Sequence, residues 1–315
     1  MSRLPRSSRP GVTACCLTLG LTLSTTARAQ SPEGQAAKRN AGTPQGLVSP
    51  KSLEESKASK APHETRFQVD PITDGAILSV SIGFTGLLEW IIGTGELQPQ
   101  QPGDTDRLLP IDREVVELKP SSTANTISNI GALSSVAYAV GSTIEGGLHH
   151  GTQRGLVDLT LYAQTATLTW AVTDLAKIAV RRPRPSAYRE RDRRLELGLD
   201  PDLSGTDNAL SFFSGHASIT ASLATTATYL AFARGTLLRG YLTLVGGATL
   251  TGVVCWGRVH GGKHFPTDVI AGTMAGMGIG LLVPHLHRAE GEESPVWIGL
   301  APVPGGQELS VSGAF

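Results

Sequence analysis

The sequence predicts an all-α protein, a bundle of about six helices followed by a short tail that resembles a β-hairpin. Six apolar stretches are each long enough for a helix, and strand-like alternation of apolar and polar residues is weak in all of them. In the tail, two short apolar runs flank the turn sequence Pro304-Gly305-Gly306. With 315 residues, the chain has room for one large helical domain or two small ones.

The N-terminal residues have the composition of a secretory signal. Three arginines precede an apolar run from about Val12 to Leu23, and Ala27-Arg28-Ala29 provides small residues before a cleavage point. We therefore predict a signal peptide over residues 1–29 and an exported protein that resides in the cell membrane or the periplasm. An uncleaved membrane anchor and a lipid-modified N-terminus are the alternatives.

The remaining chain divides into three predicted parts. Residues 30–66 are rich in Gly, Ser, Pro, Lys and Glu and have no apolar periodicity, which predicts a flexible linker. We assign residues 67–290 to the helical domain and residues 291–315 to the tail. The six apolar stretches lie near 75–94, 127–147, 155–180, 215–233, 237–257 and 267–287.

Composition favours membrane association and does not favour nucleic-acid binding. The chain has 27 basic and 27 acidic residues, so no net field attracts a polyanion. The apolar stretches are rich in small residues that suit close packing in a bilayer, although a soluble bundle tolerates them too. Four acids interrupt the stretches and would be costly in lipid unless they faced a polar interior: Glu89, Glu145, Asp158 and Asp174. The sequence therefore leaves the number of membrane spans open.

Two segments at predicted helix ends carry residues that could bind an anion or transfer a proton. Lys177 is on the last turns of the third stretch, and the chain leaves the helix at the prolines around Arg184. Ser214-Gly215-His216 opens the fourth stretch, where free backbone N–H groups favour anion binding. Taken singly, each segment also fits an ordinary helix end, with a basic last turn or a serine N-cap.

A third segment joins the fifth and sixth stretches. Pro266 fits a first helical position, which places Asp268 in the first turn and His264 just before it. A carboxylate that close can accept a hydrogen bond from one imidazole nitrogen and make the other a better nucleophile. Because His260, His264 and Asp268 recur every four residues, a metal site is the alternative. Gly261-Gly262 and Pro266 disfavour one continuous helix through all three.

The order of the three segments resembles the signature of the type-2 phosphatidic acid phosphatase and vanadium haloperoxidase superfamily. The pattern is Lys-x6-Arg-Pro, then Ser-Gly-His, then Arg-x5-His-x3-Asp, from Lys177 to Asp268. The resemblance covers about residues 70–288 and implies a helix bundle like that of the type-2 phosphatidic acid phosphatases. Two positions depart from the usual pattern, because Phe213 replaces a proline and Gly257 replaces a serine.

Carried over by position, the resemblance implies a metal-independent phosphatase that forms a phosphohistidine and needs no cofactor. His264 would attack phosphorus, oriented by Asp268, and His216 would protonate the leaving oxygen and then activate water. The phosphate oxygens would be held by Lys177, Arg184, Ser214, Gly215 and Arg258. Fixed positive charge around these oxygens is what phosphoryl transfer chiefly requires of a protein.

Several functions remain open at the level of the sequence. The leading hypothesis is a phosphatase of lipid phosphate monoesters or diphosphates, with a phosphorylated lipid or small phosphoester as substrate and membrane lipid as partner. A soluble exported acid phosphatase of broad specificity is the first alternative. A vanadium-dependent haloperoxidase is the second, since the same pocket can bind vanadate in place of phosphate. A membrane protein with a decayed site, which binds without catalysis, is the third.

Overall fold

The computed structural model describes most of the chain after the predicted linker. The described residues are 64–98, 100–203, 205–235 and 237–289, with the backbone of two strands at 296–303 and 306–313. The chain divides into two compact units, and one of them, Pro62–Glu292, contains the helices. The predicted signal peptide and residues 30–63 of the predicted linker lie outside the described residues, so their boundaries stay predictions.

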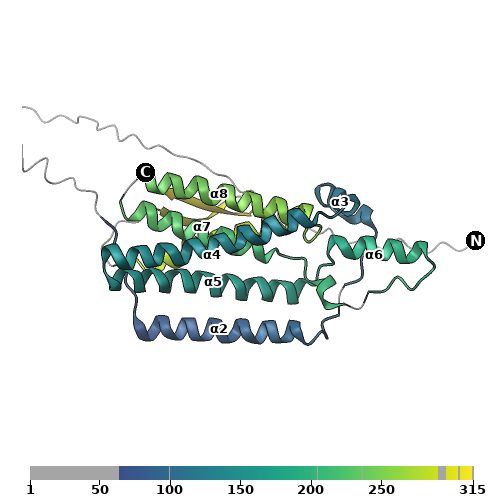
Figure 1. The fold of residues 1–315 in the computed structure, drawn as a ribbon, viewed down its shortest axis with the longest axis horizontal. Helices are drawn as coiled ribbons and strands as arrows, with labels where there is room; N and C mark the ends of the chain where they lie inside the picture. Colours follow the sequence, from purple (N-terminus) through teal and green to yellow (C-terminus); the bar gives the residue numbers. More distant parts are fainter. Residues whose placement is uncertain are drawn as a thin grey trace, which may run out of the picture. The chain divides into compact units, whose positions relative to one another are not determined.

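Each of the six apolar stretches forms a helix, which confirms the all-α prediction for the helical unit. These long helices run along a common axis (Figure 1). In chain order they are α2 (Pro71–Gly93), α4 (Ser122–His150), α5 (Thr152–Val180), α7 (Gly215–Ala233), α8 (Leu237–His260) and α9 (Pro266–Leu286).

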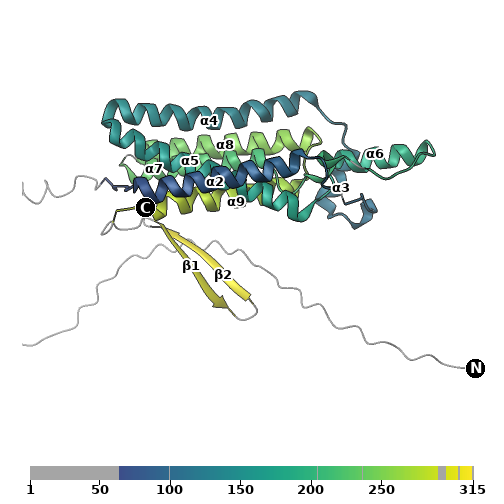
Figure 2. The same ribbon diagram turned by 90° about the horizontal axis from the view of Figure 1, so that it is seen from below.

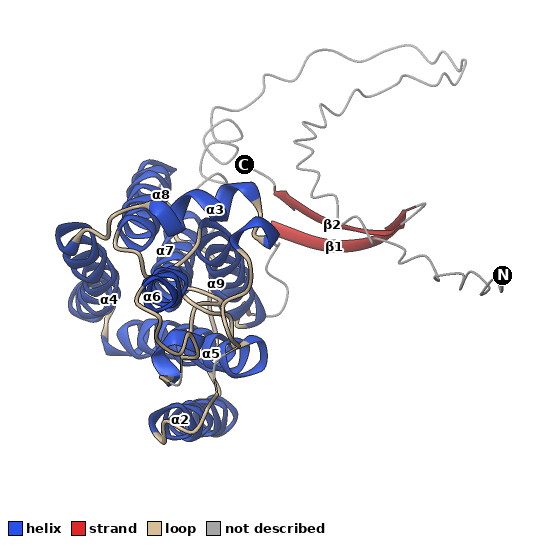
Figure 3. Cartoon of the chain, turned by 90° about the vertical axis from the view of Figure 1, so that its right-hand side faces the viewer, coloured by secondary structure: helices blue, strands red, loops and turns tan. Residues whose placement is uncertain are grey.

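The central helix of the unit is α7, which lies between α4, α5, α8 and α9 when the bundle is viewed along its axis (Figure 3). It packs backbone to backbone against α9. A Cβ atom added to Gly276 would lie 2.1 Å from the carbonyl oxygen of Ser218, and one added to Gly280 would lie 2.4 Å from that of Ser222. Only glycine permits this approach, so the two helices are held at short distance along their length.

Two short helices were not predicted from the sequence, namely α3 (Pro110–Glu117) and α6 (Pro185–Glu196). Both lie at one end of the bundle (Figure 1). The first is short, and the second is too rich in charged residues to show apolar periodicity. They are stabilised by a small apolar cluster in which Tyr188 of α6 packs edge-on against the buried ring of Phe265, beside Val115 and Val116 of α3.

Four of the described helices, α2, α4, α8 and α9, are long and apolar enough to cross a membrane, which indicates membrane association. Their outward faces carry exposed apolar side chains such as Trp90, Leu133 and Leu242. By contrast, α7 is not among the helices that are apolar enough to cross a membrane. The serine and threonine side chains that lower the hydropathy of α7 are buried among its neighbours.

The second compact unit contains the two strands of the tail. β1 (Val296–Val303) and β2 (Gly306–Gly313) pair in antiparallel fashion, with Ile298 opposite Val311. Figure 2 shows the two strands side by side. The backbone therefore has the hairpin form that the turn sequence predicted.

Candidate active site

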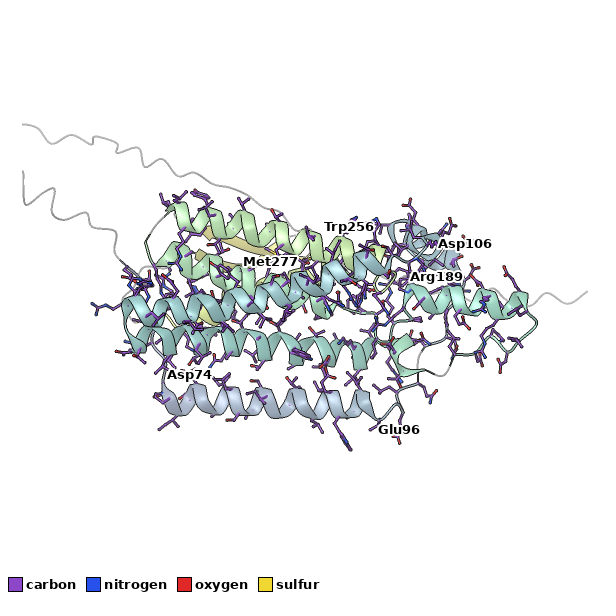
Figure 4. The ribbon with its side chains drawn as sticks, viewed as in Figure 1. Asp74, Glu96, Asp106, Arg189, Trp256 and Met277 are labelled. Atoms are coloured by element: carbon purple, nitrogen blue, oxygen red, sulfur yellow. The ribbon has the colours of Figure 1, made fainter. Side chains whose placement is uncertain are left out.

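The three motif segments meet at one end of the helical unit. α5 and α8 end there, α7 and α9 begin there, and α3 and α6 lie beside them (Figure 1). In Figure 4 the labelled Arg189 of α6 marks this end, and Asp74 at the start of α2 marks the opposite end. The backbone N–H of Ser214 donates to the carbonyl of Asp268 at 3.1 Å, which joins the second motif directly to the third.

His264 is buried and held through one ring nitrogen. Its Nδ1 lies 2.8 Å from the carbonyl oxygen of Ser211, and only 3% of the residue is exposed. A carbonyl only accepts hydrogen bonds, so Nδ1 carries the proton and Nε2 keeps its lone pair. Among the described residues, Nε2 has no hydrogen-bond partner. The available nitrogen is therefore the one suited to nucleophilic attack.

Asp268 does not make the direct hydrogen bond to His264 that its position suggested. Its Oδ2 is 4.0 Å from Nδ1 of His264, because both carboxylate oxygens have other partners. Oδ2 accepts from the Ser211 hydroxyl at 2.6 Å and from the Phe265 N–H at 2.9 Å, and Oδ1 accepts from Arg182 at 2.5 Å. The carboxylate thus caps α9 and reaches the imidazole only through Ser211.

The N-terminal end of α7 has the features of an anion-binding site. Ser214 is the N-cap, and its Oγ accepts from the Ala217 N–H at 3.4 Å. A Cβ atom added to Gly215 would lie 3.9 Å from Nζ of Lys177, so the ammonium group stands next to the first turn. Lys177 itself is held by Asp174 at 2.9 Å. A lysine beside a helix N-terminus favours a negatively charged ligand.

Arg258, on the last turn of α8, is placed by neutral groups. Its Nη1 donates to Oδ1 of Asn125 at 2.9 Å and of Asn129 at 3.3 Å, both on α4. The residue is only 7% exposed, and its Nε has no hydrogen-bond partner within the described part of the chain. The guanidinium therefore keeps its full charge and unused donors.

The unusual glycine at position 257 explains how α4 comes close enough to hold Arg258. A Cβ atom on Gly257 would lie 2.6 Å from the carbonyl oxygen of Ala124 and 2.8 Å from Cβ of Ser128. The other departure, Phe213, is buried and packs edge-on against Phe212. It fills space next to α9, since its ring lies 3.4 Å from where a Cβ on Gly272 would be.

Arg184 is the third cation of the site. It precedes α6, and its Nε and Nη2 bind Asp207 at 2.8 and 2.9 Å, through the backbone carbonyl and the carboxylate. Its Nη1 lies 3.5 Å from the carbonyl oxygen of Lys263, next to His264. The side chain is 12% exposed, whereas that of its partner Asp207 is 75% exposed. Solvent screens the exposed carboxylate, so it weakens the buried guanidinium only in part.

Both histidines lie in the field of the same three cations. Burial, followed by the charges of Arg258, Lys177 and Arg184, lowers the pKa of His216 to about 4. Burial and the same cations hold the pKa of His264 well below its ordinary value. Both imidazoles are therefore neutral near pH 7, and a bound anion would raise the pKa of each.

The alternative metal site is not formed. His260 is exposed, its ring stacks on Trp256 with centroids 4.9 Å apart, and its Nδ1 lies 3.0 Å from the Trp256 carbonyl oxygen. Within the described ranges, His, Cys, Asp and Glu side chains nowhere gather in a group of three that could hold a metal ion.

Sequence reasoning missed several residues that support this end of the bundle, and each is distant in the chain from its partner. They are Asp112, Asn125, Asn129, Arg182 and Ser211. The spacing of Asn125 and Asn129 was a usable signal, because polar residues four apart on an apolar helix share one face.

Comparison with known families places the motifs in a single domain. Residues 158–292 match the model of the PAP2 superfamily, a stretch that includes every residue from Lys177 to Asp268. The match confirms the resemblance found in the sequence and supports a phosphatase-type hydrolase. It excludes α2, α3 and α4, so Asp112 and Asn125 lie outside it. Neither a curated protein nor a solved structure matches the chain.

Proposed function

We propose that the protein is a metal-independent phosphatase that passes a phosphoryl group from its substrate to His264 and then to water. The observation that carries this proposal is the meeting of the helix ends, where Lys177 lies beside the first turn of α7 and Arg184 lies next to the Lys263 carbonyl. The charges of these cations and of Arg258 act on both histidines, in agreement with that geometry. A tetrahedral phosphate is a ligand that such a cluster of cations and a helix N-terminus would bind.

In the first step, Lys177, Arg184 and Arg258 hold the phosphate oxygens together with the start of α7. Nε2 of His264 attacks phosphorus, and the bond from phosphorus to the leaving oxygen breaks. His216 gives its proton to that oxygen, because the charge of the bound phosphate has raised the pKa of the imidazole from its low value.

In the second step, neutral His216 takes a proton from a water molecule. The water oxygen attacks phosphorus, the bond between phosphorus and His264 breaks, and inorganic phosphate forms. The hydrogen bond from Nδ1 to Ser211 keeps the same tautomer available for the next cycle. Asp268 takes part indirectly, since it binds the Ser211 hydroxyl.

We further propose that the substrate is a lipid phosphate monoester or diphosphate and that the protein is exported to the cell membrane. The ends of α8 and α9, both apolar enough to span a bilayer, frame the site. A phosphate bound there would lie at the level of lipid headgroups, where a lipid substrate can reach it without leaving the bilayer.

The test compares His264→Ala with His260→Ala, a histidine four residues earlier that is exposed and stacked on Trp256. Phosphate release is measured from phosphatidate, a polyprenyl diphosphate and a water-soluble aryl phosphate, with protein in detergent or membranes. We expect the His264 variant to lose at least about 1,000-fold in turnover and the His260 variant to remain active. Quenching in alkaline detergent with a radiolabelled substrate should trap a phosphoenzyme that is stable in base and labile in acid, and only when His264 is present.

Two results would contradict the proposal. Near-normal turnover by the His264 variant rules out the covalent route. Activity confined to the aryl phosphate, in a protein that stays soluble without detergent, replaces the lipid phosphatase with an exported acid phosphatase.

A further inference from the structure

We propose that Arg182 and Asp112 are positioning residues for His264 and act on it through Asp268 and Ser211. The inference rests on the proposed function, since it assigns a purpose to the orientation of the nucleophile. It concerns groups outside the phosphate-binding set, because both terminal nitrogens of Arg182 and both carboxylate oxygens of Asp112 are already occupied by hydrogen bonds within the protein.

Asp112, from the short helix α3, anchors the outer end of this connection. The residue is fully buried. Its Oδ1 accepts from the backbone N–H of Thr267 at 3.1 Å, and its Oδ2 accepts from the Thr267 hydroxyl at 2.7 Å and from Arg182 at 2.8 Å. A buried carboxylate needs such partners, and here they tie α3 to the first turn of α9.

Arg182 is fixed in position and in the orientation of its plane. Nη2 binds Asp112, and Nη1 binds Oδ1 of Asp268 at 2.5 Å and the Thr267 hydroxyl at 2.7 Å. The guanidinium carbon lies 4.3 Å from the centroid of the Phe265 ring, over its face. Two carboxylates and an aromatic ring leave this side chain a single arrangement.

The connection to the nucleophile passes through Ser211. Its hydroxyl donates to Asp268 at 2.6 Å, and its backbone N–H donates to the carbonyl oxygen of Arg182 at 3.1 Å. Ser211 is thus held at both its side chain and its backbone, and its own carbonyl is directed at Nδ1 of His264. Arg182 acts on Ser211 twice, directly through its backbone and indirectly through Asp268.

The arrangement has a kinetic consequence because the connection ends on the reacting imidazole and not on the phosphate. Disturbing Arg182 or Asp112 would leave Lys177, Arg184 and Arg258 in place but turn or shift the nucleophile. Outer partners of this kind typically change turnover by about 10- to 100-fold, since small displacements of a nucleophile from its line of attack are costly.

The experiment uses Arg182→Gln and Asp112→Asn in the full chain and measures ground-state and transition-state binding separately. Inorganic phosphate probes the cations alone, whereas vanadate probes the nucleophile as well, because it mimics the transferring group in line with Nε2. We expect kcat per active enzyme to fall about 10- to 100-fold, with KM and the inhibition constant for phosphate within about twofold. The inhibition constant for vanadate should rise about as much as kcat falls.

The matched control is Arg189→Gln. Arg189 also holds α3, through the carbonyl oxygens of Val115, Val116 and Leu118 at 3.2 to 3.5 Å, but it is not part of the connection to His264. The Arg189→Gln variant should therefore loosen α3 while the hydrogen bonds that position His264 stay in place. Should Arg182→Gln fail to fold, Asp112→Asn and Arg182→Lys make the same comparison, since lysine keeps the charge but cannot bridge two carboxylates.

The possible results separate the inference from the proposed function. If the wild type releases phosphate and His264→Ala does not, yet the Arg182 and Asp112 variants keep kcat and vanadate inhibition, the positioning role is wrong. An equal loss for vanadate and phosphate also overturns it, because that result places the defect in the phosphate-binding set. A wild type without phosphatase activity refutes the proposed function itself.

Discussion

Two buried arginines at the same end of the bundle differ in what surrounds them. At the junction of α3 and α9, Arg182 binds two carboxylates, those of Asp112 and Asp268. At the junction of α4 and α8, Arg258 binds the amide oxygens of Asn125 and Asn129. Carboxylates neutralise a guanidinium and fix it as part of the framework, whereas amides hold it without removing its charge. For these two arginines, the partners therefore distinguish structural charge from charge kept for a ligand.

The largest effect is expected when Arg258 is given a carboxylate partner like those of Arg182. Asn125→Asp changes the amide to a carboxylate of the same shape, so the guanidinium should stay in place but lose its effective charge. We expect phosphate to bind about 10- to 100-fold more weakly, measured as the inhibition constant of inorganic phosphate. Asn125→Ala, which removes the amide without adding charge, is the comparator and should lose less. Equal losses in the two variants would show that geometry and not charge is what Asn125 supplies.

A smaller effect is expected from moving α4 away from Arg258. Gly257→Ala places a methyl group against the Ala124 carbonyl, and we expect it to lower the free energy of unfolding by about 1 to 3 kcal/mol. Gly252→Ala is the control on the same helix, because a Cβ at that position has no heavy atom within 4 Å. Thermal unfolding in detergent measures both variants. A Gly257 variant as stable as the control would mean that the two helices are not in close contact.

The smallest expected effect is on the pH dependence of catalysis. The field of Arg258 helps to lower the pKa of His264, so neutralising that field in Asn125→Asp should raise this pKa toward its ordinary value. Protonated His264 cannot attack, and the acid limb of kcat/KM should move to higher pH by less than about one unit. Profiles of wild type and Asn125→Ala with the same substrate provide the reference. If the acid limb of kcat/KM does not move, or moves to lower pH, then the charge of Arg258 does not control the titration of His264.

The sequence predicted those parts of the molecule that depend on local pattern. Long apolar stretches predicted the six long helices, and short motifs with fixed spacing led to the prediction that Lys177 and Asp268 belong to one site. The roles of Asp112 and Asn125 could not be predicted from the sequence, because they depend on how α3 and α4 pack against helices that are distant in the chain. The expected bond from Asp268 to His264 was wrong for a related reason. Asp268 does lie near His264, but its carboxylate oxygens already accept from the Phe265 N–H, the Ser211 hydroxyl and Arg182.

The close contact between α7 and α9 at Gly276 and Gly280 limits how far the two helices can move at this site. Because carbonyl groups of one helix lie directly against Gly276 and Gly280 of the other, neither helix can slide or rotate without a steric clash. The opening turn of α7 and the start of α9, which His264 precedes, are therefore held at a fixed separation.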